Sequence, residues 1–198
     1  MSLLLFLISF GYLLGSIPFG LVLCRLAGYG DIRAIGSGNI GATNVLRTGN
    51  KALAALTLIL DISKGFIAVL VAGFLTDNHT FMALAGFAAI LGHNFPVWLS
   101  FKGGKGVATS IGTIVAIHPP VGLSMIIGWL ITALLFRISS LSALVAFIIA
   151  PLVAAYLLPA SLVYIIYLIC LLGAVRHHQN ITRLLEGIEP TINVKKNA

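Results

Sequence analysis

Long apolar runs, each about the length of a membrane-spanning helix, occupy most of this 198-residue chain. A transmembrane helix needs roughly 20 mainly apolar residues. Hydrophobic residues make up 59% of the sequence and charged residues only 9%, whereas soluble domains carry about 25% charged residues. So few charged side chains cannot cover the surface of a water-soluble globule of this size. The sequence therefore predicts an all-α integral membrane protein, organised as a single polytopic membrane domain over residues 1–198.

Seven segments are candidates for membrane-spanning helices. We place them at about 3–24, 52–75, 81–99, 104–117, 120–136, 141–158 and 161–175. The apolar part of the fourth segment, 107–117, is short by itself, so this segment includes the preceding glycines or crosses obliquely. The first segment has no basic stretch before it and no small-residue cleavage site, which indicates a retained span rather than a signal peptide.

The positions of the basic residues favour one topology. With seven transmembrane helices and the N-terminus outside, eleven of the 12 Lys and Arg residues lie on the cytoplasmic side, and Lys64 lies inside a span. If the fourth segment turned back, the bases would divide six against five. Because cytoplasmic loops are enriched in Lys and Arg, seven crossings are expected. The C-terminus is then cytoplasmic, and the three polar segments described next form active-site loops on the cytoplasmic face.

The first polar segment, residues 36–47, has the sequence GSGNIGATNVLR. Glycines permit tight turns whose N–H groups can surround an anion, and arginine adds a fixed positive fork. Its candidate binding residues are Gly36, Ser37, Gly38, Asn39, Thr43, Asn44 and Arg47. The alternative is a flexible loop followed by a capped helix. A cap does not need several neutral donors together with an arginine, so an anion site is favoured.

The second polar segment, residues 92–110, contains the run FKGGKGVATS. Glycines on both sides of a lysine, opening directly into a helix, place N–H groups and the positive helix end around a phosphate. The candidate residues are Lys102, Gly103, Gly104, Lys105 and Gly106. The run is not a P-loop, because Gly106 stands where that motif has Ser or Thr. The alternative is that two lysines simply mark the cytoplasmic end of a span.

The third polar segment, residues 176–189, reads RHHQNITRLLEGIE. On a helix, His177, Asn180 and Leu184 share one face. Either of its histidines could act as a base, although a histidine just past a span is more often an interfacial residue. By itself this segment would be an ordinary basic juxtamembrane tail.

Two charged residues, Asp61 and Lys64, lie inside the second predicted span. Their spacing allows them to pair on one helix face. Ionisable residues are costly in lipid and usually line a site or a pathway. A structural ion pair that orients the helices is an equally weighted interpretation.

The same residues disfavour several classes of function. The net charge of +7 indicates positive-inside topology and an anionic lipid or substrate rather than nucleic acid. The only acids on the cytoplasmic face are Asp31, Glu186 and Glu189, so we expect no magnesium site and no other metal. The residues alone therefore indicate a phosphate-binding membrane enzyme or carrier that works without a metal.

The three polar segments resemble the signature motifs of the PlsY family, the bacterial acyl-phosphate:glycerol-3-phosphate acyltransferases. The similarity runs from end to end of the chain and includes residues 14–20 and 61–65. It implies transfer of a fatty acyl group from acyl-phosphate to the 1-hydroxyl of sn-glycerol 3-phosphate, giving 1-acylglycerol 3-phosphate (lysophosphatidic acid) and phosphate. This reaction is the first acylation in phospholipid synthesis, at the bacterial cytoplasmic (inner) membrane. No cofactor is implied, because acyl-phosphate already carries a good leaving group.

The resemblance also implies roles for individual residues. Lys105, with the N–H groups of the three glycines around it, would hold one phosphate. Arg47, with hydroxyl and amide donors of its own segment, would hold the other or stabilise the oxyanion. His177 and Asn180 would orient the acceptor or take its proton, or the acceptor's own phosphate would take that proton.

The expected catalytic residues are Ser37, Asn39, Lys105, His177 and Asn180. The expected substrate-binding residues are Gly36, Gly38, Thr43, Asn44, Arg47, Lys102, Gly103, Gly104, Gly106 and Arg183. The expected supporting residues are Asp61, Lys64, His93 and Glu189.

Two alternative functions remain open at this point. One is a transporter of an organic phosphate, for which Asp61 and Lys64 would mark the pathway. The other is a different membrane lipid-phosphate enzyme, such as a phosphatase.

Overall fold

The computed structural model describes residues 2–192, and within that range the regular structure is helical, without strands. This confirms the all-α prediction. The α-helices are α1 (Ser2–Gly15), α2 (Phe19–Leu26), α3 (Ala42–Val45), α4 (Lys51–Leu75), α5 (His79–Asn94), α6 (Val107–Ile117), α7 (Pro119–Phe136), α8 (Ser139–Leu157), α9 (Ala160–Arg176) and α10 (His178–Leu185). Short 3-10 helices lie at Ile32–Ala34, Leu46–Thr48 and Val97–Leu99.

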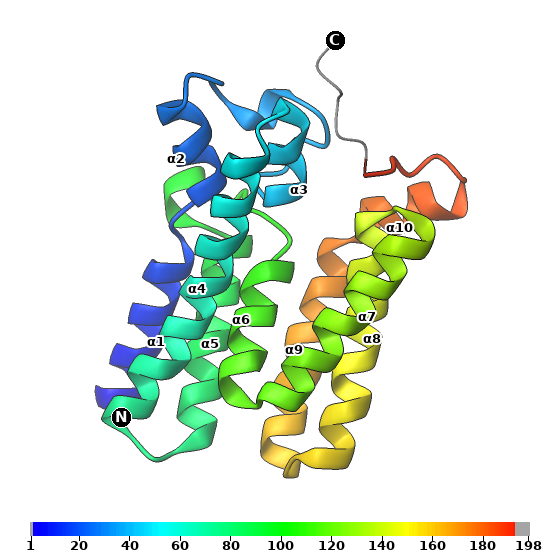
Figure 1. The fold of residues 1–198 in the computed structure, drawn as a ribbon. Coiled ribbons are helices and arrows are strands. Elements are labelled where there is room, and N and C mark those ends of the chain that lie inside the picture. The colour runs from blue at the N-terminus through cyan, green and yellow to red at the C-terminus, as the bar shows by residue number, and fades with distance from the viewer. Residues whose placement is uncertain (1, 193–198) are drawn as a thin grey trace.

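Successive long helices run in alternating directions along a bundle (Figure 1). The short connections after α4, α6 and α8 lie at the end where the N-terminus lies. The segments that carry α2, α3 and α10, together with the connection between α5 and α6, lie at the opposite end. The three polar segments therefore gather at one end of the molecule, as the sequence predicts. This end is called the polar end below.

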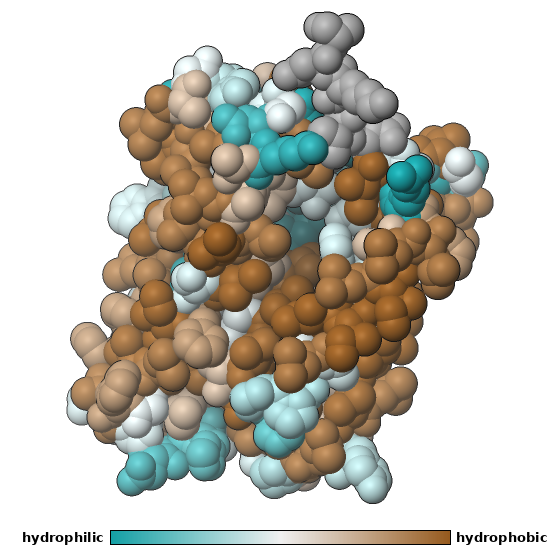
Figure 2. Space-filling view, in the orientation of Figure 1, coloured by the Kyte–Doolittle hydropathy of each residue, from teal (hydrophilic) through white to brown (hydrophobic). Residues whose placement is uncertain are grey.

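The sides of the bundle are suited to lipid. Figure 2 shows a mainly hydrophobic surface along the helices, with hydrophilic residues concentrated at both ends. Within residues 2–192, five helical stretches are long and apolar enough to cross a membrane, namely Ser2–Leu26 (α1 with α2), Lys51–Leu75, His79–Leu99, Pro119–Phe136 and Ser139–Leu157. The helices α9 and α10, bent by 59° at their junction, together make a sixth candidate. The helix α6 has only 11 residues, about half the usual length of a span. The crossing count of seven and the orientation of the loops stay predictions.

Small residues bring the first helix close to α5. A Cβ atom on Gly11 or Gly15 would collide with the backbone of Ala85 or Ala89, so only glycine permits this approach. Close packing through small residues is typical of helix contacts in membranes. The helices α1, α4, α5 and α6 form one group, and α7, α8 and α9 form a second that contacts α5 and α6.

Two predicted spans are interrupted at prolines. The segment 3–24 is not one helix, because α1 ends at Gly15 and α2 begins after Pro18. The segment 81–99 ends as an α-helix at Asn94, just before Phe95 and Pro96. Proline has no N–H to donate and disfavours helical geometry at the residue before it. Both breaks lie toward the polar end, so they leave irregular backbone close to the site.

The fourth predicted span is also shorter than expected. The segment 104–117 is helical only from Val107, and residues 102–106 form an irregular loop. Gly106 has a left-handed φ of 79° at the helix start. The glycines therefore belong to a loop at the polar end rather than to the helix.

The charged pair inside α4 is buried. The Lys64 Nζ lies 2.8 Å from the Asp61 Oδ1, and the two side chains are 1% and 4% exposed. The same ammonium donates a hydrogen bond to the carbonyl of Ile17, 3.2 Å away, in the break between α1 and α2. Lys64 thus adds a second donor to this carbonyl, which also accepts from the Phe19 N–H at 3.1 Å. Asp61 also lines the pocket described next.

Candidate active site

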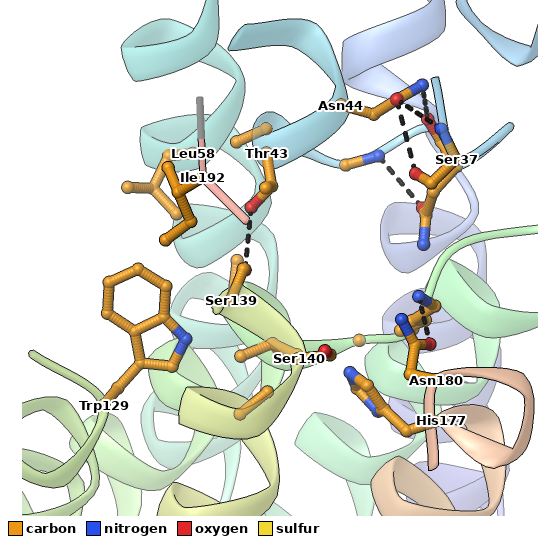
Figure 3. A pocket seen from close by; sticks show the side chains of 18 of the residues that line it. Ser37, Thr43, Asn44, Leu58, Trp129, Ser139, Ser140, His177, Asn180 and Ile192 are labelled. Atoms are coloured by element: carbon orange, nitrogen blue, oxygen red, sulfur yellow. Dashed lines mark hydrogen bonds between the residues drawn. The ribbon is translucent and has the colours of Figure 1, made fainter. Parts of the chain in front are cut away.

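A pocket of about 310 Å³ opens at the polar end, where the two groups of helices meet. All three polar segments contribute to its wall. Its polar lining residues include Ser37, Asn39, Thr43, Asn44, Arg47, Asp61, His93, Lys105, Ser139, Ser140, His177, Asn180, Arg183 and Glu189. Figure 3 shows Leu58, Trp129 and Ile192 on one side and Ser37, His177 and Asn180 on the other. The pocket is therefore apolar on one side and polar on the other.

The first polar segment is organised around the buried amide of Asn44. Its Oδ1 accepts a hydrogen bond from the Ser37 N–H at 3.0 Å, and its Nδ2 donates to the Asn39 carbonyl at 2.8 Å. These bonds bring Ser37 and Asn39 to the pocket. Asn44 lines the pocket as well, but its Nδ2 also donates to the carbonyls of Ile32 and Ile35 just before the segment, so its amide is occupied in shaping the loop.

The two expected glycines of this segment lie outside the pocket lining. Gly36 and Gly38 have φ angles of 58° and 69°, the left-handed region that favours glycine. A Cβ on Gly36 would collide with the side chains of Asn44 and Arg47. Both glycines therefore let the loop turn, and Gly36 also leaves space for Arg47, which does line the pocket.

In the second segment, Lys105 and Gly106 line the pocket, but Lys102, Gly103 and Gly104 do not. The expectation that the Gly103 and Gly104 N–H groups bind phosphate is wrong for this structure. Each donates instead to the end of α5, Gly103 to the Asn94 carbonyl at 3.2 Å and Gly104 to the His93 carbonyl at 3.0 Å. Lys102 is exposed.

The start of α6 provides other donors at the same place. Gly106, Val107 and Ala108 line the pocket, and no side chain caps this helix start. The first turn of an α-helix leaves N–H groups without intrahelical partners and carries partial positive charge. Together with the Lys105 ammonium, this helix start can bind a phosphate.

The third segment supplies a connected set of polar side chains. The Lys105 Nζ donates to the Asn180 Oδ1 at 2.6 Å, and the Asn180 Nδ2 donates to Glu189 at 2.5 Å. Glu189 also accepts from the Arg183 Nε at 2.6 Å. The second and third segments are thereby joined, and Glu189 holds both Asn180 and Arg183.

His177 lies at the bend between α9 and α10 and is 2% exposed. Its Nδ1 is 2.7 Å from the Gly173 carbonyl. Because a carbonyl can only accept, Nδ1 carries the hydrogen and Nε2 keeps its lone pair. The ring lines the pocket near Ser140 and Asn180 (Figure 3).

Burial shifts the protonation of two of these groups. The pKa of Lys105 is lowered to about 8, mainly by burial; Glu189 opposes this shift, and the guanidinium groups of Arg183, Arg176 and Arg47 contribute to it. Burial also lowers the pKa of His177 to about 4. Near neutral pH, Lys105 is therefore mostly charged and His177 is neutral.

The sequence interpretation missed two serines at the start of α8. Ser140 donates to Glu189 at 2.7 Å, and the Ser139 and Thr43 hydroxyls are 3.1 Å apart, which links α8 to the first polar segment (Figure 3). The predicted topology placed residues 137–140 on the same face as the three segments, which was the available signal. Serines at a helix start are common, so composition alone did not distinguish them.

The apolar part of the pocket was also missed. It is lined by Leu58 and Ile62 of α4, Ile111 of α6, and Ile126, Trp129 and Leu130 of α7. Leu58 and Leu130 are 43% and 48% exposed on the side of the bundle. Figure 2 shows a recess near the polar end with hydrophilic residues inside and hydrophobic residues around it. An apolar chain could therefore pass from the lipid into the site.

Within residues 2–192, no three His, Cys, Asp or Glu side chains are grouped closely enough to hold a metal ion. The metal-free mechanism expected from the sequence stays a prediction.

Comparison with known sequences gives one consistent result. The sequence profile of the family described as Glycerol-3-phosphate acyltransferase matches residues 5–187. A glycerol-3-phosphate acyltransferase of Paramagnetospirillum magneticum is 59% identical over 186 residues, covering 94% of this chain and 92% of that protein. A protein of the same name from Rhodospirillum rubrum is 56% identical over 195 residues, covering 95% of this chain and 90% of that protein.

Two solved structures have the same fold. One is a crystal structure of PlsY (YgiH), described as an integral membrane glycerol 3-phosphate acyltransferase, in its glycerol 3-phosphate form. Its TM-score is 0.90 at 42% identity, with coverage of 95% of this chain and 94% of that chain. The lysophosphatidic acid form of the same enzyme gives a TM-score of 0.87 at 41% identity, with the same coverage.

Proposed function

This chain belongs to the glycerol-3-phosphate acyltransferase family, and we propose that its pocket transfers a fatty acyl group from acyl-phosphate to the 1-hydroxyl of sn-glycerol 3-phosphate. The products are 1-acylglycerol 3-phosphate and inorganic phosphate. The relatives' organisms support a bacterial cytoplasmic membrane as the location. The protein is thus a multi-pass membrane acyltransferase whose donor, residue roles and orientation are proposals.

The observation that carries the proposal is the two-sided pocket. Its polar side holds three basic side chains, at Arg47, Lys105 and Arg183, which suits two substrates that each carry a phosphate. Its apolar side reaches the exposed flank of α4 and α7, which suits a fatty chain. A soluble phosphate compound and a lipid donor can therefore meet in one cavity.

Lys105 and the start of α6 bind one phosphate in this proposal. Lys105, Gly106 and Val107 all line the pocket, and the start of α6 has no side-chain cap. The first turn of such a helix offers N–H groups and partial positive charge to an anion. Arg47, with Ser37, Asn39 and Thr43, binds the second phosphate or the oxyanion that forms at the acyl carbon. Removal of one such oxyanion donor typically lowers the rate about 100- to 1,000-fold.

In the reaction, the acceptor hydroxyl oxygen attacks the acyl carbonyl carbon. A carbon–oxygen ester bond forms, the bond from that carbon to the phosphate oxygen breaks, and phosphate leaves. We assign the hydroxyl proton to the acceptor's own phosphate, because His177 with a pKa of about 4 is a weak base. The Nε2 of His177 then accepts a hydrogen bond from the hydroxyl and orients it.

Product analysis tests the donor. Purified protein in lipid nanodiscs is given glycerol 3-phosphate with either palmitoyl-phosphate or palmitoyl-coenzyme A, and 1-palmitoylglycerol 3-phosphate is measured by mass spectrometry. We expect product with palmitoyl-phosphate as the donor and none with palmitoyl-coenzyme A. Product from the coenzyme A ester alone would refute the donor assignment. Uptake of glycerol 3-phosphate into proteoliposomes, without any acyl product, would favour the transporter.

A further inference from the structure

The loop that presents Lys105 has a backbone that needs external support. Phe101 and Gly106 have φ angles of 63° and 79°. A left-handed backbone at a bulky residue such as Phe101 is strained and persists only when its surroundings hold it. The contacts that fix residues 101–106 therefore determine where Lys105 lies.

One set of contacts comes from α5. The Gly103 and Gly104 N–H groups donate to the carbonyls of Asn94 and His93. The His93 ring lies directly against Gly104, where a Cβ atom would collide with it. These contacts attach the loop to the end of α5.

A further set of contacts with the loop backbone comes from Arg176, in the last turn of α9. Its Nε and Nη2 donate to the Gly104 carbonyl at 3.2 and 3.0 Å, and its Nη2 also donates to the Gly103 carbonyl at 3.1 Å. The guanidinium carbon lies 5.0 Å from the centre of the Phe95 ring. Arg176 thus binds both carbonyls next to Lys105, yet it does not line the pocket.

We propose that Arg176 is a positioning residue for the acyl transfer, which holds the two glycine carbonyls so that Lys105 and the first turn of α6 face the substrate phosphate. The inference rests on the proposed function, in which Lys105 binds that phosphate. A planar guanidinium can donate to two carbonyls while it stacks on an aromatic ring. A lysine ammonium is a point charge on a flexible stem and does not reproduce this arrangement.

Chemical rescue of the full chain in nanodiscs tests the proposal. Arg176→Ala is expected to lower kcat/KM about 100-fold, because a displaced binding group loses its alignment. Millimolar guanidinium is expected to raise the kcat/KM of Arg176→Ala about 10-fold, because it can replace the lost hydrogen bonds. Methylammonium at the same concentration is expected to leave it unchanged. Arg176→Lys keeps the charge and is expected to stay impaired. The matched control is Arg25→Ala, since Arg25 is an exposed partner of Asp31 outside the pocket.

Each outcome has a defined meaning. The proposal predicts unchanged thermal midpoints for both Arg176 variants together with rescue that is specific for guanidinium. It is overturned if Arg176→Ala turns over like wild type, if methylammonium rescues equally, or if both variants lose their fold. Wild-type protein that yields no acyl product would instead refute the proposed function itself. If the wild-type protein forms acyl product and Arg176→Ala forms it equally fast, only the inference about positioning is refuted.

Discussion

Lys105 and Asn180 are 75 residues apart in the chain, yet the lysine Nζ donates a 2.6 Å hydrogen bond to the asparagine Oδ1. This bond joins the loop before α6 to the segment after α9 across the pocket. Asn180 is held in turn by Glu189. The position of the ammonium is therefore set by the third polar segment as well as by its own loop.

Lys105→Met is expected to lower kcat/KM about 100- to 1,000-fold, because it removes the cation from a buried phosphate site. Steady-state assays that vary each substrate separately will measure the change and identify the substrate whose phosphate Lys105 holds. Lys102→Met is the informative comparison, since Lys102 lies outside the pocket lining. An equal loss in both variants would contradict the structural distinction between these two lysines.

The pH dependence should report the charge of Lys105. Its pKa of about 8 means that the ammonium is present below that pH and is lost as the pH rises through it. The kcat/KM is therefore expected to fall on the alkaline side of about pH 8. In Lys105→Arg this alkaline fall should disappear, because a guanidinium stays charged. An unchanged profile in that variant would assign the titration to another group.

His177→Ala separates orientation from general base catalysis. With a pKa of about 4, His177 is neutral at physiological pH and suits hydrogen-bond acceptance better than proton removal. The variant is expected to raise the KM for glycerol 3-phosphate and to keep measurable turnover at saturating acceptor. Near-complete loss of kcat at saturation would instead make His177 the base.

Gly104→Ala tests the close contact between the loop and α5. The new Cβ would collide with the His93 ring, so we expect a lower thermal midpoint and lower activity, with overpacking costs of about 1–3 kcal/mol. Gly73→Ala is the matched control, because its Cβ would approach only the flexible end of Met82. Equal tolerance of both substitutions would show that the loop is not packed as described.

The buried pair of Asp61 and Lys64 should behave as a coupled unit. Removal of one partner leaves an uncompensated buried charge, which typically costs about 3–5 kcal/mol. Asp61→Leu alone is therefore expected to destabilise the protein more than Asp61→Leu combined with Lys64→Met. Thermal midpoints of the single and double variants in the same lipid measure this coupling. Additive losses would argue against a buried ion pair.

The sequence predicted the helices and the convergence of the three polar segments well. The length of each apolar run and the distribution of Lys and Arg between the loops reflect the membrane environment, and they do not depend on how the side chains pack. It did not predict the break at Pro18, since the residues on both sides of it are apolar enough for a continuous span. A single hydropathy pattern does not report where a proline interrupts hydrogen bonding.

Details of the site depended on contacts between distant elements. Gly103 and Gly104 were expected to face a phosphate, but their N–H groups are taken by carbonyls of α5. Which N–H groups of a glycine-rich loop stay free is decided by how the loop closes on its neighbours. The role of Ser140 depends likewise on its contact with Glu189, 49 residues away.

The most direct test of the account is release of inorganic phosphate from palmitoyl-phosphate by the purified protein, with and without glycerol 3-phosphate, in the presence of a chelator. Release is expected to require the acceptor, to persist without divalent metal, and to match the lysophosphatidic acid formed mole for mole. Release that is independent of the acceptor would identify a hydrolase. No release from folded protein with both substrates present would contradict the proposed acyl transfer.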